Sequence, residues 1–544
     1  MIKKHTISPA MLAKYLFSIV LTFLAKINMP SIHYLVASFL ELTAIGVFSN
    51  MLMSKHKATC RIVNDLLMLL YNMQMAVMLF GNSYITMVVL SSLPSVKALS
   101  GQATLYISSA CVILLFSVLP INRVVLYEKV NGLYVLPIIL CIELIFTLSY
   151  GIAFSPMLGY CSLGIQCAKK VNTYGKLIMA EQIYQCKDIK EDIYDEIKNY
   201  IAKENLTEYP NVILIFTEGL SQNVISDARQ IMPNVAEYQK KSLNFINYYN
   251  HTFATYRGLI GQLYSGYQLE DCDNNALISI QSILSDHGYA TAFLNTEPNN
   301  RYFTTYLKNF GFDELVCDAK TVCNGMSQSV SDKDAYEMLF DKALSLRNGD
   351  SPFFLAMYTF GTHVSFNSVD EKYGDGSNAT LNKFYNLDYQ FGKFMDKLLT
   401  SSLTKNTIVV FTADHATYQD ASFNATFPEY TRFAQSLDEI PLFIYYDGIT
   451  PETIDVQGRN SINLAPTLLD YLDISAPNYF VGTSLFSGSA ASICETSFSD
   501  SFITWSSAGG SINEIKGTEL DEFQQKILDY YILKSKAQKC AEAK

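Results

Sequence analysis

Five long apolar segments occupy the first 150 residues of this 544-residue chain, and they restrict its fold more than any other feature. A membrane helix needs about 20 mostly apolar residues. The fourth segment is short, so one of the five could instead be a helix that lies at the membrane surface. We predict a transmembrane domain over residues 1–152, with helices at Met11–Leu24, Ile32–Met51, Asp65–Val89, Thr104–Leu119 and Leu133–Tyr150.

Charge divides the chain at the same place. Residues 1–150 hold 10 Lys and Arg against 4 Asp and Glu, whereas the rest of the chain carries a net charge of −17. Such an acidic soluble part repels phosphate backbones, which excludes a general nucleic-acid binder. Lysine and arginine in short loops mark the cytoplasmic side of a membrane protein. With the N-terminus inside, the cytoplasmic segments carry seven such residues and the outer loops two: Lys3, Lys4, Lys55, Lys57, Arg61, Arg123 and Lys129, against Lys26 and Lys97.

Everything after about residue 152 is therefore expected outside the cytoplasm. We interpret residues 153–208 as a connecting helical segment, with a surface helix over Asp188–Lys203. Eight cysteines lie beyond residue 152, and an oxidising compartment would pair them. Cys317 and Cys323 are close enough in sequence for a local bridge, and the remaining connectivity stays open.

Short, wholly apolar runs alternate with helical stretches from residue 209 onward. Such runs are typical of strands buried on both faces of a parallel sheet. The alternation predicts an α/β domain with a mainly parallel sheet over residues 209–544. We expect strands at Asn211–Phe216, Ala290–Leu294, Pro352–Tyr358, Thr407–Phe411 and Pro441–Tyr446. We expect helices at Ile278–His287, Asp332–Arg347 and Asn382–Leu399.

Reactive side chains follow several of these strands, and ligands in such folds bind beyond the carboxyl ends of the strands. Glu218 follows the first strand, His363 the third, and Asp414 with His415 the fourth. Carboxylates and an imidazole suit a hard or borderline divalent cation. Such a cation activates a hydroxyl and neutralises a phosphoryl oxygen. Each residue alone is more often simply solvated, so the prediction depends on their joint placement.

A second Asp-His pair shows why the placement matters. Asp286 and His287 follow a helical stretch and precede a strand. We interpret them as a helix terminus with Gly288 as its cap, and not as part of the site.

Short motifs in a fixed order resemble those of the alkaline-phosphatase/sulfatase-like superfamily. Within it, the chain resembles the membrane-anchored branch of lipoteichoic acid synthases, periplasmic phosphoglycerol transferases and lipid A phosphoethanolamine transferases. Those proteins also place five spans before an extracytoplasmic catalytic domain. The motifs are Asn211–Glu218, Thr252–Tyr267, Asn300-Arg301 with Gly311–Asp313, Pro352–His363, Thr407–His415, Ile440–Ile444, Asn463–Asp470 and Gly482–Phe486.

The resemblance implies a metal site and a covalent mechanism. A divalent metal ion, zinc or manganese, would be bound by Glu218, Thr255, Asp414 and His415. Thr255 would take a phosphoryl-containing headgroup from a phospholipid donor as a phosphothreonine, and would pass it to a surface glycan or glycolipid. The phosphate or the acceptor would be held by His363 and Arg301. The implied location is the bacterial inner (cytoplasmic) membrane, with several passes and the catalytic domain facing the periplasm or the outside.

Several alternatives stay open at this point. Thr252 lies three residues before Thr255, which we favour because Gly258–Tyr264 resembles the helix after the family's nucleophile. The headgroup would be phosphoglycerol or phosphoethanolamine, and the residues after Glu218 mildly favour phosphoglycerol. A phosphodiesterase, phosphatase or other sulfatase-like hydrolase would use the same residues with water as the acceptor. An inactive scaffold that binds lipid or glycan is the third reading.

Overall fold

The structure is a computed structural model, and its contacts divide the chain into two compact units. One unit is built on the N-terminal helices and the other on an α/β sheet, and each is described by itself. The described residues are 7–26, 32–53, 56–81, 84–85, 90, 103–122, 132–150, 154–161, 163–165, 167–168, 190–191, 206, 209–268, 277–324, 327–349, 351–364, 366–430, 432, 437–487, 495–498, 504–523, 525–527 and 530.

The N-terminal unit has a helix at each of the five predicted apolar segments. They are α1 (Pro9–Ala25), α2 (Ile32–Met53), α3 (Lys57–Gly81), α5 (Ala103–Ser117) and α6 (Gly132–Tyr150). Helix α2 and residues Lys57–Phe80 of α3 are long and apolar enough to cross a membrane, judged by length and composition. The other three are shorter apolar helices. Together these helices indicate that the chain is anchored in a membrane.

The predicted start of the third segment at Asp65 is wrong, because α3 begins eight residues earlier at Lys57. Asp65 lies inside the helix, where Nζ of Lys14 in α1 lies 2.6 Å from its Oδ1. The same Nζ donates to the carbonyl of Leu119 at 3.2 Å. A charge that is paired inside a helix bundle need not end an apolar helix. The predicted end, Val89, lies outside the described residues.

A buried carboxylate ties the chain that follows α6 to α2. Glu41 of α2 accepts hydrogen bonds from the Ser155 hydroxyl and from the backbone N–H of Met157, whose nitrogen lies 2.9 and 3.0 Å from the two carboxylate oxygens. The Ser155 hydroxyl also lies 3.3 Å from Oε1 of Glu143 in α6. The first residues of the predicted connecting segment are therefore fixed to the helices before it.

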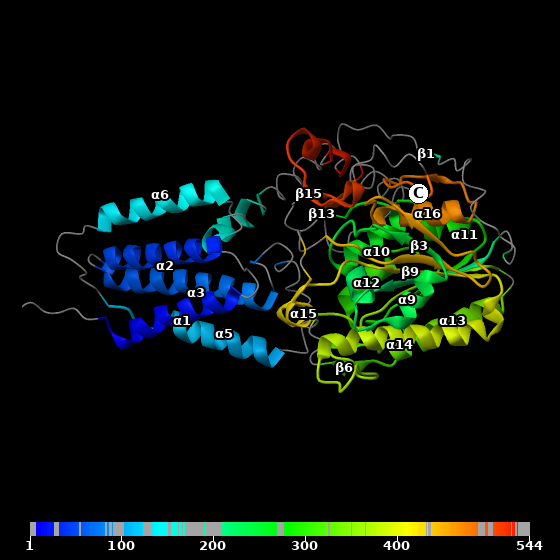
Figure 1. Cartoon of the computed structure of the whole chain (residues 1–544), viewed down its shortest axis with the longest axis horizontal. Helices are drawn as coiled ribbons and strands as arrows, with labels where there is room; N and C mark the ends of the chain where they lie inside the picture. The colour runs from blue at the N-terminus through cyan, green and yellow to red at the C-terminus, as the bar shows by residue number, and fades with distance from the viewer. Residues whose placement is uncertain are drawn as a thin grey trace, which may run out of the picture. The chain divides into compact units, whose positions relative to one another are not determined.

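An eight-stranded sheet forms the centre of the α/β unit (Figure 1). Its strands, in spatial order, are β11 (Glu452–Asp455), β3 (Leu243–Ile246), β10 (Leu442–Tyr445), β9 (Thr407–Ala413), β2 (Asn211–Thr217), β8 (Phe353–Tyr358), β4 (Ala290–Leu294) and β5 (Glu314–Val316). Strand β10 runs antiparallel to both of its neighbours, and the other strand pairs of this sheet are parallel. Strands β2, β8 and β9 are buried along their whole length, as strands covered on both faces must be.

Helices cover the sheet in two groups, which Figure 1 shows on its opposite sides. One group holds α9 (Pro233–Lys240), α13 (Asp332–Arg347) and α14 (Ala379–Leu399). The other holds α10 (Thr255–Tyr264), α11 (Ile280–Asp286) and α16 (Leu464–Tyr471). The predicted α/β domain with a mainly parallel sheet is confirmed. All five predicted strands and all three predicted helices are present, whereas β3, β5 and β11 were not predicted.

Two finer predictions have a different outcome in the structure. Of the surface helix expected over Asp188–Lys203, only Lys190–Glu191 is described. These two residues form strand β1, paired antiparallel with Pro477–Asn478, and the rest of the predicted helix lies outside the described residues. The local disulfide between Cys317 and Cys323 is not formed, because Cys317 is a free cysteine. Its sulfur lies 3.7 Å from Nδ2 of Asn295, so the thiol faces the loop after β4.

Candidate active site

Three parallel strands bring the candidate site together at one edge of the sheet. In the central pairing of β2 with β9, Thr217 lies opposite Ala413, so Glu218 and Asp414 leave the sheet side by side. On the other flank of β2, Phe216 pairs with Tyr358, the last residue of β8. The parallel direction of these strands is what places their carboxyl ends at a common edge.

Glu218, Asp414 and His415 form a buried group that could hold a metal ion. One ligand atom from each lies within 4.8 Å of the others, and the three residues are at most 4% exposed. Nε2 of His415 lies 3.5 Å from Oε1 of Glu218 and 3.6 Å from Oδ2 of Asp414. This geometry brings together three of the residues that the sequence assigned to a metal.

Neighbouring backbone groups orient these side chains toward the centre of the group. Oδ1 of Asp414 accepts hydrogen bonds from the N–H of Gly219 at 2.8 Å and of His415 at 2.7 Å. Its Oδ2 is buried and has no hydrogen-bond partner among the described residues. Nδ1 of His415 lies 2.7 Å from the carbonyl of Ala416, which places a proton on Nδ1 and leaves Nε2 as the nitrogen that could bind a metal. An orphaned carboxylate oxygen and Nε2 of His415 therefore face each other, 3.6 Å apart.

The charge balance of the group also suits a cation. Burial raises the pKa of Glu218, and the nearby Asp414 carboxylate raises it further. Burial acts to lower the pKa of His415, but the carboxylates of Asp414 and Glu218 outweigh it, and the net shift is upward. Two buried carboxylates beside one imidazole make a donor set that fits zinc or manganese.

Thr255 supplies the hydroxyl that contacts the Glu218, Asp414 and His415 group. Its Oγ1 donates a hydrogen bond to Oε2 of Glu218 at 2.8 Å. Thr255 begins α10, directly after Ala254, whose φ of +85° is an unusual backbone conformation for a residue with a Cβ. Oγ1 of Thr252 is buried and has no hydrogen-bond partner among the described residues. Of the two candidate threonines, the structure brings Thr255 to the group.

Glycines let α10 approach the metal ligands closely. A Cβ added at Gly258 would lie 2.0 Å from the carbonyl oxygen of Asp414. A Cβ added at Gly261 would lie 1.9 Å from Nε2 of His251, a buried side chain that contacts Ser461. Gly258 therefore lets α10 lie directly against the backbone of Asp414, and Gly261 lets it lie against the ring of His251.

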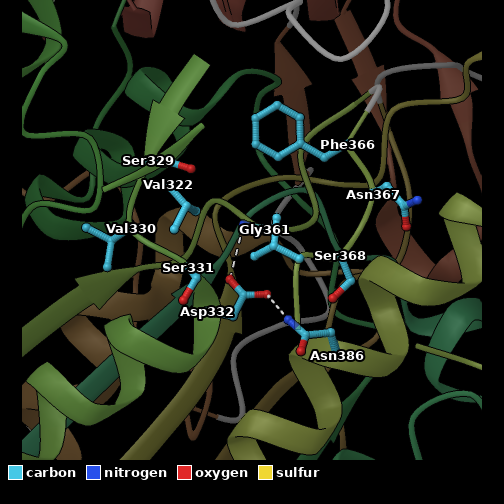
Figure 2. A pocket seen from close by; sticks show the side chains of 11 residues that line it. Val322, Ser329, Val330, Ser331, Asp332, Gly361, Phe366, Asn367, Ser368 and Asn386 are labelled. Atoms are coloured by element: carbon cyan, nitrogen blue, oxygen red, sulfur yellow. Dashed lines mark hydrogen bonds between the residues drawn. The ribbon is translucent and has the colours of Figure 1, made fainter. Parts of the chain in front are cut away.

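His363 lies in the turn after β8, where it stacks on Phe360 with ring centroids 4.7 Å apart. Burial lowers its pKa, and the Glu218 carboxylate acts in the opposite direction, so His363 lies within electrostatic reach of the group. A carboxylate supports this turn from below: the N–H of Gly361 donates to Oδ1 of Asp332 at 3.1 Å, and Nδ2 of Asn386 donates to its Oδ2 at 3.4 Å (Figure 2). Burial raises the pKa of Asp332 to about 7.

Arg301 is placed differently from the other predicted site residues. It is the exposed first residue of α12 (Arg301–Lys308). Among the described residues, no contact joins Arg301 to the group at Glu218. Its assignment to the phosphate or the acceptor stays a prediction.

Arg432 joins the two turns that carry the candidate ligands, and the sequence analysis did not identify it. Its Nη1 donates to the carbonyl of Thr417 at 2.6 Å, and its Nη2 donates to Oγ of Ser221 at 2.7 Å. Ser221 and Thr417 also bond each other's backbone N–H, at 2.9 and 3.0 Å. Arg432 itself pairs with Asp438 at 3.0 Å. Each turn is thereby held three residues beyond Glu218 and Asp414.

Three comparisons bear on the family. The sulfatase family model matches residues 210–474. A curated relative, an uncharacterized protein of Haemophilus influenzae, is 23% identical over 272 residues, which span 48% of this chain and 42% of that protein. A solved structure of an alkaline phosphatase superfamily protein from Vibrio parahaemolyticus is 18% identical and covers 68% of this chain and 96% of its own, with a TM-score of 0.52.

A membrane protein shares the arrangement over more of the chain. The integral membrane protein lipooligosaccharide phosphoethanolamine transferase A of Neisseria meningitidis is 14% identical and covers 87% of this chain and 96% of its own, with a TM-score of 0.52. At these identities the two solved structures establish the fold. The residues that match the sulfatase family model run from β2 to α16 and enclose Glu218, Thr255 and the Asp414-His415 pair, so this part of the chain is similar to the sulfatase family.

Proposed function

We propose that this chain is a metal-dependent transferase that moves a phospholipid-derived headgroup, phosphoglycerol or phosphoethanolamine, to a cell-surface glycan or lipid. The observation that carries the proposal is the 2.8 Å hydrogen bond from Thr255 to Glu218 inside a buried Glu-Asp-His group. A hydroxyl is a poor nucleophile until a base or a metal activates it. The group supplies both a carboxylate acceptor and a set of metal ligands.

The reaction would proceed in two displacements. Oγ1 of Thr255 attacks the phosphorus of the donor, the bond from phosphorus to the diacylglycerol oxygen breaks, and diacylglycerol leaves with the proton that Thr255 gave up. A hydroxyl of the acceptor then attacks the phosphothreonine, the bond from phosphorus to Oγ1 breaks, and Thr255 regains its proton. A bound divalent cation would lower the pKa of the Thr255 hydroxyl and neutralise charge on the phosphoryl oxygens. His363, kept neutral by burial, and Arg301 are assigned to the phosphate or the acceptor.

The anchored N-terminal helices favour a lipid donor over a soluble one. We propose that they form five spans in a bacterial cytoplasmic membrane and place the sulfatase-family part outside the cytoplasm. A headgroup on the outer leaflet would then lie near the site without leaving the bilayer. The Neisseria meningitidis protein is named as a lipooligosaccharide phosphoethanolamine transferase, and that activity belongs to the same class of reaction.

Intact mass of the purified full-length protein tests the proposal. The protein is prepared in its membrane, its metal content is measured, and its mass is compared before and after exposure to phospholipid vesicles. We expect bound divalent metal and an added mass equal to one phosphorylated headgroup. Thr255→Ala should abolish the added mass, whereas Thr252→Ala, the matched control three residues away, should keep it.

The other readings give different results in the same experiment. Bound metal without an added mass, together with release of free phosphorylated headgroup into solution, would assign the chain to the hydrolases. Absence of metal, of added mass and of any released product would leave only a lipid- or glycan-binding scaffold. An added mass that survives in Thr255→Ala would contradict the assignment of the nucleophile.

A further inference from the structure

A third buried carboxylate lies at the same edge of the sheet. Glu297 follows β4 and is 8% exposed. Its Oε2 accepts a hydrogen bond from Nδ2 of Asn300 at 3.2 Å. Its Oε1 accepts from the Tyr358 hydroxyl at 3.1 Å, but that hydroxyl also lies 3.3 Å from Oδ1 of Asn295. One hydroxyl proton is therefore shared between two acceptors, which leaves Glu297 only partly satisfied.

The fold places Glu297 beside the nucleophile's site. Strand β8 separates β4 from β2, and strands lie about 4.8 Å apart, so the ends of β4 and β2 are roughly 10 Å apart. Tyr358 ends β8, and the next residue, Thr359, accepts a hydrogen bond from the N–H of Glu218 at 3.2 Å. Burial raises the pKa of Glu297 to about 7, and the Glu218 carboxylate contributes to that rise.

Helix α12, which follows the Glu297 loop, also contacts the residue after the nucleophile. The Tyr306 hydroxyl of α12 donates to the backbone carbonyl of Tyr256. The ring of Tyr306 lies edge-on to that of Tyr256, with centroids 6.4 Å apart. The loop that carries Glu297 and the helix that carries Thr255 are thus fixed to each other.

Glu297 differs from Glu218 and Asp414 in what can balance its charge. Those two carboxylates share a site whose donor atoms suit a divalent cation. Among the described residues, no lysine, arginine or histidine forms an ion pair with Glu297, and its hydrogen-bond donors are neutral. A buried carboxylate without a positive partner is unfavourable, and a cationic ligand group with N–H donors would relieve it.

The two candidate headgroups differ in whether they carry a positive charge. Phosphoglycerol offers only hydroxyls beyond the phosphate, whereas phosphoethanolamine offers a primary ammonium with three N–H donors. We propose that Glu297 is the specificity-determining residue that binds the ammonium of the donor headgroup, so that the donor is an ethanolamine phospholipid. This inference rests on the proposed transfer of a headgroup, and it reverses the mild preference for phosphoglycerol drawn from the residues after Glu218.

A donor comparison with a charge-neutralising variant tests the inference. Full-length protein is incubated with vesicles of phosphatidylethanolamine or of phosphatidylglycerol with matched acyl chains, and the rate at which the added mass appears is measured for each. We expect wild type to react at least about tenfold faster with the ethanolamine lipid. Glu297→Gln, which keeps the size and an acceptor oxygen, should bring the ratio of the two donor rates to about one.

Asp388→Asn is the matched control, because it neutralises another buried carboxylate in the same unit. Asp388 caps α9 through the N–H groups of Asn234 and Val235, at 3.1 and 2.7 Å, and belongs to α14. Its neutral variant should keep the ratio of the two donor rates. A wild-type preference for phosphatidylglycerol, or an equal loss with both donors in Glu297→Gln, would overturn the inference and make Glu297 a support of the β4 loop.

A binding measurement distinguishes failure of this inference from failure of the proposed function. O-phosphoethanolamine and glycerol phosphate are titrated into the metal-loaded protein by calorimetry, which needs no transfer. A preference for O-phosphoethanolamine that disappears in Glu297→Gln would support the ammonium site even if neither lipid left an added mass, in which case the transferase proposal alone would fall. Equal binding of the two compounds would overturn the ammonium site whatever the transfer assay gave.

Discussion

The Gly258→Ala variant measures how closely the helix of the nucleophile must approach the metal ligands. A Cβ at residue 258 would lie 2.0 Å from the carbonyl oxygen of Asp414 and 2.7 Å from its carbonyl carbon. Ordinary contacts of a Cβ begin near 3.4 Å, so the two backbones must separate by about 1.4 Å along that direction. Neither contact atom belongs to a side chain that could turn away.

The displacement acts on the chemistry more than on stability. Thr255 lies one turn before Gly258, so it moves with α10, and its 2.8 Å hydrogen bond to Glu218 would be lost. Misplacing a reacting group by about 1 Å can cost roughly 100-fold in rate. Overpacking costs about 1–3 kcal/mol, and replacing a helical glycine by alanine returns about 1 kcal/mol. The net loss of folding free energy should therefore be about 0–2 kcal/mol.

The assay follows the added mass on Thr255 with time, together with thermal unfolding. We expect about 100-fold slower modification and a small change in Tm. Gly164→Ala is the control, because a Cβ there meets no heavy atom within 4 Å, and it should leave both quantities unchanged. A modification rate within about twofold of wild type would refute the reasoning. So would complete loss of folding, because it would mean that the contact cannot relax by moving α10.

Three further outcomes follow from the same geometry. Chelation should lower Tm, and readdition of zinc or manganese should restore it, with a gain of about 2.7 kcal/mol at a metal concentration 100 times Kd; an unchanged Tm would contradict the metal site. Burial raises the pKa of Asp332 to about 7, so the stability that the protonated carboxyl contributes is complete below pH 3.8 and is lost as pH rises to 7. The Tm of Asp332→Asn, measured relative to wild type, should therefore increase between pH 5 and pH 8. A Tm difference that stays constant over this range would contradict the prediction. Arg432→Lys cannot bridge Ser221 and Thr417, so metal affinity measured by competition should fall about 10- to 100-fold with the fold retained.

Burial pattern decided which strands could be predicted from the sequence. The predicted strands Asn211–Thr217 and Thr407–Ala413 are buried at every position, so their apolar runs stand out from polar neighbours. Strand β11 is mostly exposed and β5 lies at an edge of the sheet, so neither has such a run. Strand β3 alternates buried and less buried residues over only four positions. Short or exposed strands take their structure from pairing, which the local sequence does not display.

Position after a buried strand distinguished the two Asp-His pairs. Asp414-His415 follows a buried strand and lies in the candidate site, whereas Asp286 ends α11 and His287 is its C-cap. Gly288 follows with a φ of +84°, as expected for a helix cap. Position at a strand's carboxyl end was therefore more informative than the residue types themselves.

Glu297 also follows the carboxyl end of a predicted strand, but the sequence analysis did not select it. It lies three residues beyond Leu294, the end of a correctly predicted strand, so the search that found Glu218 could have found it. Its burial and its contact with Tyr358 depend on the neighbouring strand, and the sequence alone does not display them. Arg432 is further out of reach, because its two partners lie 211 and 15 residues away along the chain.

Charge balance links the metal site to the choice of donor. The edge of the sheet concentrates three buried carboxylates, at Glu218, Asp414 and Glu297, and burial is unfavourable for each of them as an anion. A divalent cation can balance the first two because their oxygens converge on His415, but Glu297 points into a separate set of neutral donors. The substrate must then supply the remaining positive charge. A site that has to be completed by its substrate in this way discriminates by charge, which the hydroxyls of an uncharged glycerol group cannot imitate.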